Sequence, residues 1–209
     1  MEKNAKEVWI TEPPPEDEDE ISQPQTLLGK LVDVIFSFLE SVALGGAFFV
    51  VVYLFIMQPH QVKGNSMYPT YHDKEYILTD KISYKFRLPE RGDVIILKSP
   101  KNPDIDFIKR VVALSGEKIK IENGQVYLNN QVLKEPYLTT ETPLFPSGFM
   151  QEALEVTVPE NMVFVMGDNR PGSSDSREFG FIPLENIIGR VFFRYFPLDR
   201  AGLIIKPDY

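Results

Sequence analysis

The sequence predicts a mainly β protein that carries one N-terminal transmembrane helix, and three observations lead to this fold class. Residues 41–57 form an apolar run without any charged side chain. From Gln61 onward, short runs rich in β-branched and aromatic residues alternate with turn signals. Helical periodicity is nearly absent outside the apolar run. We therefore expect residues 59–209 to form an antiparallel β-sheet or barrel-like body.

Charge divides the chain into two unequal parts. The 209 residues carry a net charge of −8, of which residues 1–40 contribute −7 and residues 41–209 contribute −1. A body so close to neutrality is a poor nucleic-acid binder. The chain has no Cys, which excludes disulfides, a thiol nucleophile and Cys-ligated zinc. His60 and His72 are too few and too badly spaced for a metal site, so we expect two surface histidines and neither a metal nor another cofactor.

The N-terminal segment, residues 1–26, has the composition of a disordered acidic tail. Residues 12–20 combine a proline run with an acidic run, and such a segment buries too little apolar surface to offset chain entropy. The alternative is a docking motif around Val8-Trp9-Ile10, whose Trp is the only one in the chain. The sequence identifies no partner for it.

Residues 27–58 are predicted to form a membrane anchor with its core at residues 41–57. That core spans roughly 26 Å as a helix, slightly less than the hydrocarbon thickness, and residues 35–39 extend it. Pro59 cannot continue the helix. A buried core helix is the alternative, and a cleaved signal peptide fits poorly because the acidic tail precedes the apolar run. The positive-inside count, with Lys30 before the run and Lys63, Lys74 and Lys81 after it, would place the body in the cytoplasm.

Seven runs in the body are predicted strands, and two dipeptides are predicted turns. Asn123-Gly124 indicates a tight hairpin and Asn129-Asn130 a second turn. Two prolines and a glycine without any clear period make residues 139–153 an expected exposed loop. The predicted strands are residues 93–97, 107–112, 119–121, 125–128, 156–158, 162–166 and 190–195.

The segment around Ser66 is the first that could carry chemistry. Gly64 permits unusual backbone angles and Pro69 stiffens the far side, so Ser66 could present its hydroxyl and its backbone N–H together, as acyl transfer requires. A serine between a glycine and a proline is also an ordinary turn in most proteins.

Lys109, within an apolar strand run, is the second candidate. A lysine of ordinary pKa is about 0.04% neutral at pH 7, and a general base needs a pKa about three units lower, at roughly 4 kcal/mol. Burial among apolar side chains could supply that shift. The alternative is an exposed lysine on an alternating strand. Residues 167–180, rich in small and polar side chains, form the third candidate, and could equally be a surface turn.

Together these segments resemble bacterial type I signal peptidases, which are membrane-anchored serine proteases with a Ser–Lys dyad. Four blocks match in order, and the resemblance extends from the anchor to about Arg194. They are G-N-S-M-Y-P-T at 64–70, R-G-D-V-I at 91–95, F-I-K-R-V-V at 107–112, and G-D-N-R…S-D-S-R…G-F at 167–181.

The resemblance implies a mainly β catalytic domain of the signal peptidase type, with Ser66 as nucleophile and Lys109 as general base acting through an acyl-enzyme. It implies that Ser173 hydrogen-bonds the lysine and that ion pairs support the site, with Asp168, Asp175, Arg110 and Arg177 as their members. We expect Ser66 Oγ and Lys109 Nζ to lie within about 3.5 Å. Relatives with a serine hydroxyl two residues before the nucleophile have an extra oxyanion donor, and this chain has Gly64 there.

The implied substrate is a preprotein whose signal peptide adds as an extended strand beside residues 60–66 and 105–109. Apolar side chains flanking the dyad would line its pockets: Val62, Met67, Phe107 and Ile108. The resemblance implies a single pass through bacterial plasma-membrane lipid, with a cytoplasmic N-terminus and an extracytoplasmic body, against the positive-inside count. A dyad peptidase for pilins or conjugation factors and an inactive membrane-anchored binding domain are the alternatives. After Thr70, the family's usual glycine-acid turn is replaced by residues 71–76.

Overall fold

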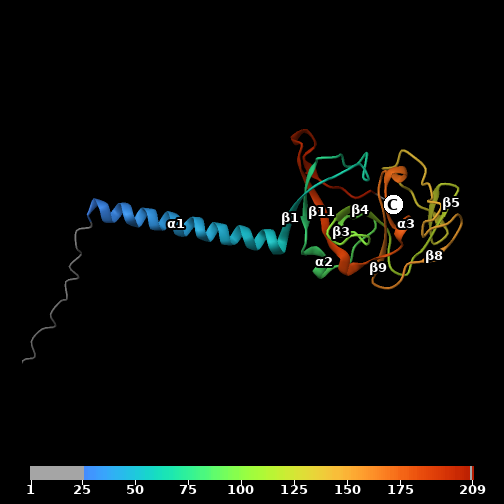
Figure 1. Ribbon diagram of the computed structural model, residues 1–209, viewed down its shortest axis with the longest axis horizontal. Helices are drawn as coiled ribbons and strands as arrows, with labels where there is room; N and C mark the ends of the chain where they lie inside the picture. The colour runs from blue at the N-terminus through green and yellow to red at the C-terminus, as the bar shows by residue number, and fades with distance from the viewer. Residues whose placement is uncertain (1–25, 208) are drawn as a thin grey trace, which may run out of the picture. The chain divides into compact units, whose positions relative to one another are not determined.

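The computed structural model describes residues 26–207 and Tyr209 (Figure 1). The predictions for the acidic tail and for Val8-Trp9-Ile10 therefore lie outside the described residues. The chain divides into two units, residues 1–46 and 47–209.

A single long helix forms the predicted anchor region. Helix α1 (Leu27–Val51) continues without a break into a π-helical turn, η1 (Val52–Ile56). The 30 residues from Leu27 to Ile56 are long and apolar enough to cross a membrane, and none of the apolar window is buried by the rest of the protein. The helix ends at Ile56 rather than at residue 58, because strand β1 (Met57–Gln61) begins at the next residue. Pro59 is accommodated there because β1 pairs on one side only.

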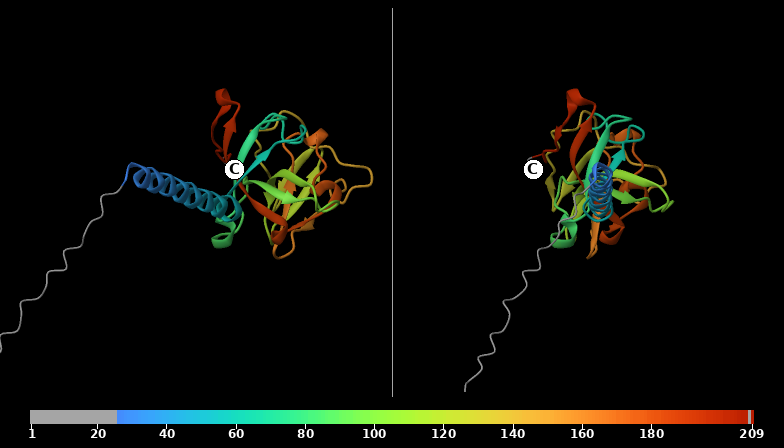
Figure 2. Two further views of the ribbon diagram at one scale, coloured as in Figure 1. Left: turned by 60° about the vertical axis from the view of Figure 1, so that its left-hand side comes forward. Right: turned by 90° about the vertical axis from the view of Figure 1, so that its left-hand side faces the viewer.

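Two antiparallel sheets form the rest of the chain, which confirms the predicted mainly β fold. The larger contains, in spatial order, β1, β2 (Tyr76–Asp80), β11 (Ile187–Phe196), β3 (Val94–Lys98), β4 (Asp106–Ala113), β9 (Met162–Met166) and β10 (Ile182–Pro183), with β12 (Gly202–Leu203) paired to β11. The smaller contains β7 (Gln131–Val132), β6 (Gln125–Leu128), β5 (Lys118–Glu122) and β8 (Val156–Thr157). The smaller sheet lies at the end of the body opposite β1 (Figures 1 and 2).

Short helical turns interrupt the strands. These are α2 (Ser83–Phe86), η2 (Arg170–Gly172), α3 (Ser176–Phe179), η3 (Leu184–Asn186) and η4 (Leu198–Arg200). All seven predicted strands are present, whereas β1, β2, β7, β10 and β12 were not predicted. Both predicted turns are confirmed: Asn123 and Gly124 have φ values of 51° and 71°, and Asn129 and Asn130 have 49° and 66°.

Strand β4 connects the packed interior of the body. Its residues enter all three hydrophobic clusters: Ile108 packs near the start of the larger sheet, Val111 near β9, and Val112 toward the smaller sheet. The prediction of an exposed loop at residues 139–153 is wrong in part. Met150 is fully buried in the cluster of the smaller sheet, and its N–H donates to the carbonyl of Arg177 at 2.9 Å.

Candidate active site

Ser66 lies in the turn region that follows β1, held by backbone contacts on both sides. The N–H of Gly64, whose φ is 81°, donates to the Asp73 carboxylate at 2.8 Å. The carbonyl of Ser66 accepts a hydrogen bond from the N–H of Asn169 at 3.0 Å. A Cβ on Gly167 would collide with that carbonyl, so the close approach requires glycine. The unusual residues 71–76 still form a turn, because Lys74 adopts a φ of 68°.

Lys109 reaches Ser66 from strand β4. Its Nζ donates to Ser66 Oγ at 3.0 Å and to the carbonyl of Ile108 at 2.9 Å, which satisfies the expected separation. The residue is 3% exposed, and its Nζ lies 5.0 Å from the centre of the Phe107 ring. In the described part of the chain, no carboxylate forms an ion pair with it. Burial lowers the pKa of Lys109 to about 8, although the charges of Asp175 and Asp168 oppose the shift.

Arg110, the next residue of β4, has the opposite environment. Its guanidinium holds both carboxylate oxygens of Asp168 at 2.8 and 2.6 Å, and Thr70 donates to the same carboxylate at 2.6 Å. Tyr137 stacks on the guanidinium at 4.2 Å. Burial is the largest single influence and would lower the pKa of Arg110, but the hydrogen bonds to Asp168 and the charge of that carboxylate together raise the pKa.

Asp175 and Arg177 form the second expected ion pair. Arg177 donates twice to the carboxylate, at 2.8 Å each, and both side chains are fully buried. Asp175 also accepts from the N–H of Gly167 at 3.0 Å. The pair therefore fixes Gly167. The next two residues are Asp168, which binds Arg110, and Asn169, whose N–H donates to the carbonyl of Ser66.

Ser173 differs from the prediction. It is buried, but its hydroxyl has no hydrogen-bond partner within the described residues, and it does not bond Lys109. Its Oγ instead packs against Gly167, where a Cβ would collide with it. The expected contact to the lysine is thus replaced by the carbonyl of Ile108.

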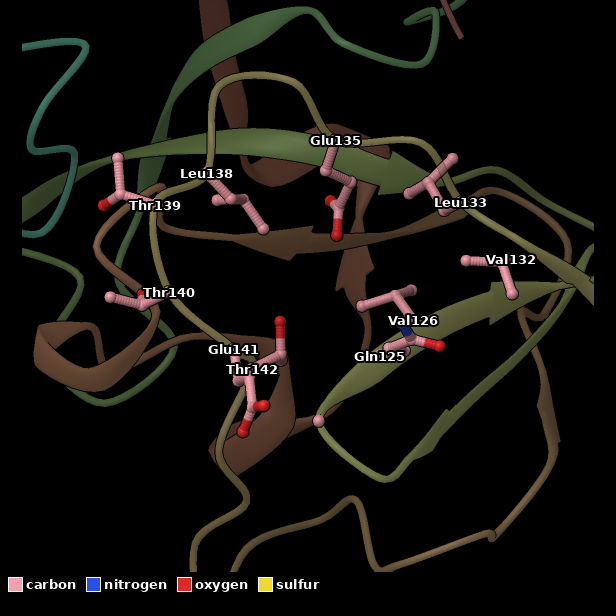
Figure 3. A pocket seen from close by; sticks show the side chains of 11 residues that line it. Gln125, Val126, Val132, Leu133, Glu135, Leu138, Thr139, Thr140, Glu141 and Thr142 are labelled. Atoms are coloured by element: carbon pink, nitrogen blue, oxygen red, sulfur yellow. The ribbon is translucent and has the colours of Figure 1, made fainter.

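A buried polar cluster that was not predicted also supports the segment that follows Gly167. Arg170 is fully buried and donates to Glu135 at 3.0 Å and to Thr142. Arg170 belongs to the G-D-N-R block, so the sequence motif could have identified it. Glu135 lies far away in the sequence and belongs to no motif. Glu135 and Thr142 also line a cavity of about 410 Å³ beside the smaller sheet, into which the Glu135 carboxylate points (Figure 3). Neither Ser66 nor Lys109 lines this cavity.

A second cavity, of about 750 Å³, contains the dyad, and we call it the dyad groove. Its lining comes from residues 59–66 and 104–109, with Ile77, Ile96, Gly172 and Ser174. Val62, Phe107 and Ile108 line it as predicted. Met67 does not: it is 1% exposed and packs in the core with Tyr71 and Ile77, because the turn after Ser66 directs it inward. His60 was expected at the surface, yet its half-buried ring lines the groove because β1 forms one wall.

Comparisons with known proteins identify the family of the chain. Residues 35–196 match the family model described as signal peptidase, peptidase S26. A probable signal peptidase I-1 of Synechocystis is 39% identical over 155 residues, which cover 71% of this chain and 76% of that protein. Signal peptidase IB of Staphylococcus aureus is 31% identical over 179 residues, 80% of this chain and 93% of that protein.

Among solved structures, a signal peptidase I from Enterococcus faecalis matches with a TM-score of 0.42 and 33% identity, over 50% of this chain and 97% of that one. The family model covers most of the anchor helix and most of the body, and the two relatives align over more than two thirds of the chain. The chain therefore belongs to the signal peptidase family, peptidase S26.

Proposed function

We propose that Ser66 and Lys109 are the catalytic dyad of this chain, a serine endopeptidase of the signal peptidase I type that removes signal peptides from preproteins. The observation that carries the proposal is the 3.0 Å hydrogen bond between Lys109 Nζ and Ser66 Oγ in a buried place. With a pKa of about 8, roughly one lysine in ten is neutral at pH 7, against fewer than one in a thousand for an ordinary lysine.

Acylation begins with proton transfer within the dyad. Neutral Lys109 accepts the Ser66 hydroxyl proton while Oγ attacks the scissile carbonyl, and a tetrahedral intermediate forms. The ammonium of Lys109 then gives this proton to the leaving amine, the peptide C–N bond breaks, and an acyl-enzyme remains. Water hydrolyses the ester by the same two proton transfers in the second half of the reaction.

The developing oxyanion needs a hydrogen-bond donor. Among the described residues, the backbone N–H of Ser66 donates to no protein acceptor, so it is free for this role. Gly64 supplies no side-chain donor. One such donor contributes about 3 kcal/mol in related chemistry, and we assign this role to the backbone N–H of Ser66.

The substrate adds to the dyad groove as an extended strand. Residues Asp106 to Lys109 of β4 pair with β3 on one side, whereas the pairing of β4 with β9 begins only at Arg110. This stretch of edge lies beside the dyad and can pair with a peptide backbone. Val62, Phe107 and Ile108 supply apolar contacts for the side chains of the signal peptide.

The test of the dyad is cleavage of a purified preprotein by the full chain in detergent. We expect Ser66→Ala and Lys109→Met to abolish cleavage while circular dichroism stays unchanged. Ser115→Ala and Lys118→Ala, at surface positions on the same body, are the matched controls and should cleave normally. Cleavage by Lys109→Met at the wild-type rate would refute the mechanism, and an inactive wild type would favour a binding domain.

The chain is anchored in a membrane, and we propose that this is the bacterial plasma membrane, with the N-terminus cytoplasmic and the body outside. The support is functional: preproteins are cleaved after their export, so a cytoplasmic groove would not reach them. Because the chain has no Cys, single cysteines report topology cleanly. In intact protoplasts, an impermeant maleimide should label Gln151→Cys and spare Asn4→Cys. The reverse pattern would contradict this orientation.

A further inference from the structure

His60 is an unexplained polar group in the dyad groove. It lies in β1 opposite Ile77 of β2, and its side chain is only 13% exposed. Its Nδ1 is within 3.0 Å of the Thr79 hydroxyl, which fixes the ring. The dyad mechanism does not use it.

The other ring nitrogen, Nε2, is buried and has no hydrogen-bond partner within the described residues. Its nearest charged partner is Asp106, the first residue of β4, whose Oδ2 lies 3.8 Å away and whose side chain is 39% exposed. That separation is too long for a hydrogen bond. A buried polar atom without a partner is costly, so a third group that hydrogen-bonds both Nε2 and the Asp106 carboxylate would be stabilised at this place.

The state of the ring follows from its surroundings. Burial holds the pKa of His60 below its ordinary value, although Asp106 opposes this, so the ring is neutral near pH 7. The carboxylate facing Nε2 favours the single ring proton at that atom. In the tautomer with this proton on Nε2, the Thr79 hydroxyl donates to Nδ1. Nε2–H then faces the Asp106 carboxylate, and among the described residues neither group has a hydrogen-bond partner.

We propose that His60 and Asp106 form a polar specificity element that binds a hydroxyl or primary amide side chain of the signal peptide. A hydroxyl oxygen about 2.8 Å from both Nε2 and Oδ2 bridges the 3.8 Å gap, accepting from the imidazole and donating to the carboxylate. The inference rests on the proposed function, because both residues line the groove that contains Ser66 and Lys109.

The chemistry predicts which substrates gain. Ser, Thr, Asn and Gln each offer an acceptor and a donor on one side chain, whereas Val or Leu at the same place would leave both protein groups without partners. A site built to hydrogen-bond a substrate discriminates strongly against analogues that lack the group. Because Asp106 is partly exposed, we expect about a tenfold preference, well below that of a fully buried site.

The experiment compares matched substrates cleaved by the full chain in detergent micelles. In one preprotein, each position from the second to the sixth before the cleavage site carries either Thr or Val, which have the same shape. We expect kcat/KM to favour Thr about tenfold at one of these positions. If the preference for Thr stays below twofold at all of these positions, the proposal is overturned.

Variants then assign the preference to this pair. His60→Phe and Asp106→Ala should each bring the Thr-to-Val ratio of kcat/KM close to one, whatever the absolute rate of cleavage. Asp106→Ala changes the first residue of β4 and keeps the proposal testable if His60→Phe does not fold. His72→Phe is the matched control: its exposed ring packs against Tyr68, and the preference should persist. A preference that survives Asp106→Ala would overturn the proposal. If the wild type cleaves none of the substrates, the proposed function itself is refuted.

Discussion

Lys109 and Arg110 are neighbours in β4, and both are 3% exposed. The surroundings of Arg110 favour its positive charge, whereas those of Lys109 disfavour it. The guanidinium of Arg110 is matched by the Asp168 carboxylate, whereas Lys109 has a hydroxyl and a carbonyl as its hydrogen-bond partners. Accordingly the pKa of Arg110 is raised, and that of Lys109 is lowered to about 8.

Burial alone does not decide whether a cation stays charged. Successive strand residues point to opposite faces, so β4 sends one cation toward the dyad groove and the next toward an anion. A paired cation stays charged and fixes structure, whereas an unpaired one at the same depth becomes available as a base.

The largest effect is expected when the groove-facing cation is made permanently charged. Lys109→Arg should lower kcat/KM by about 10²- to 10⁴-fold, because a guanidinium remains protonated at working pH and cannot accept the Ser66 proton. Cleavage kinetics in micelles measure the loss, and circular dichroism verifies the fold. Substantial activity would mean that Lys109 acts as a charge rather than as a base.

The next effect is expected when the paired cation is removed. Arg110→Met should cost about 3–5 kcal/mol of unfolding free energy, because Asp168 would be left buried without its partner. Urea unfolding of the full chain in micelles measures it. Lys101→Met is the control: its salt bridge to Glu178 is exposed, so the change should stay below about 1 kcal/mol. Equal costs for the two variants would remove the contrast.

A smaller effect of opposite sign is expected from the unpaired lysine. The folded-state pKa of Lys109 lies below its unfolded value, so charging it destabilises the fold below about pH 8, and the penalty disappears above the unfolded pKa. Lys109→Met should therefore be more stable than the wild type by about 3 kcal/mol at pH 6. The two should converge near pH 11. A destabilised Lys109→Met at pH 6 would contradict the lowered pKa.

Much of this fold could be predicted because local sequence patterns identify most of its strands. Residues 125–128 show the alternation expected of a strand and lie between two Asn-containing turns. Strand β6 has the same bounds. Strand β1 was not predicted because Pro59 and the polar residues around it resemble a loop, and its pairing with β2 makes it a strand. Strand β2, which pairs with both β1 and β11, was not predicted either, although its sequence is rich in strand-forming residues. Met150 was expected in an exposed loop because its burial depends on a contact with the distant α3 segment.

The site divides in the same way. Ser66, Lys109 and the two ion pairs followed from contiguous motifs, and the structure brings these residues together. Glu135 could not be predicted, because its partner Arg170 meets it through the fold alone. His60 was misjudged for a related reason: a lone histidine in a polar stretch gives no sign that Asp106 will face it across a groove.

The most direct test of the account is the pKa of Lys109 itself. In the full chain with ¹³C-labelled lysine side chains, the Lys109 resonance is assigned by its absence in Lys109→Met and is then followed against pH. We predict a midpoint near pH 8, with the other lysines as internal references. A midpoint near the ordinary lysine value of about 10.4 would contradict the central claim.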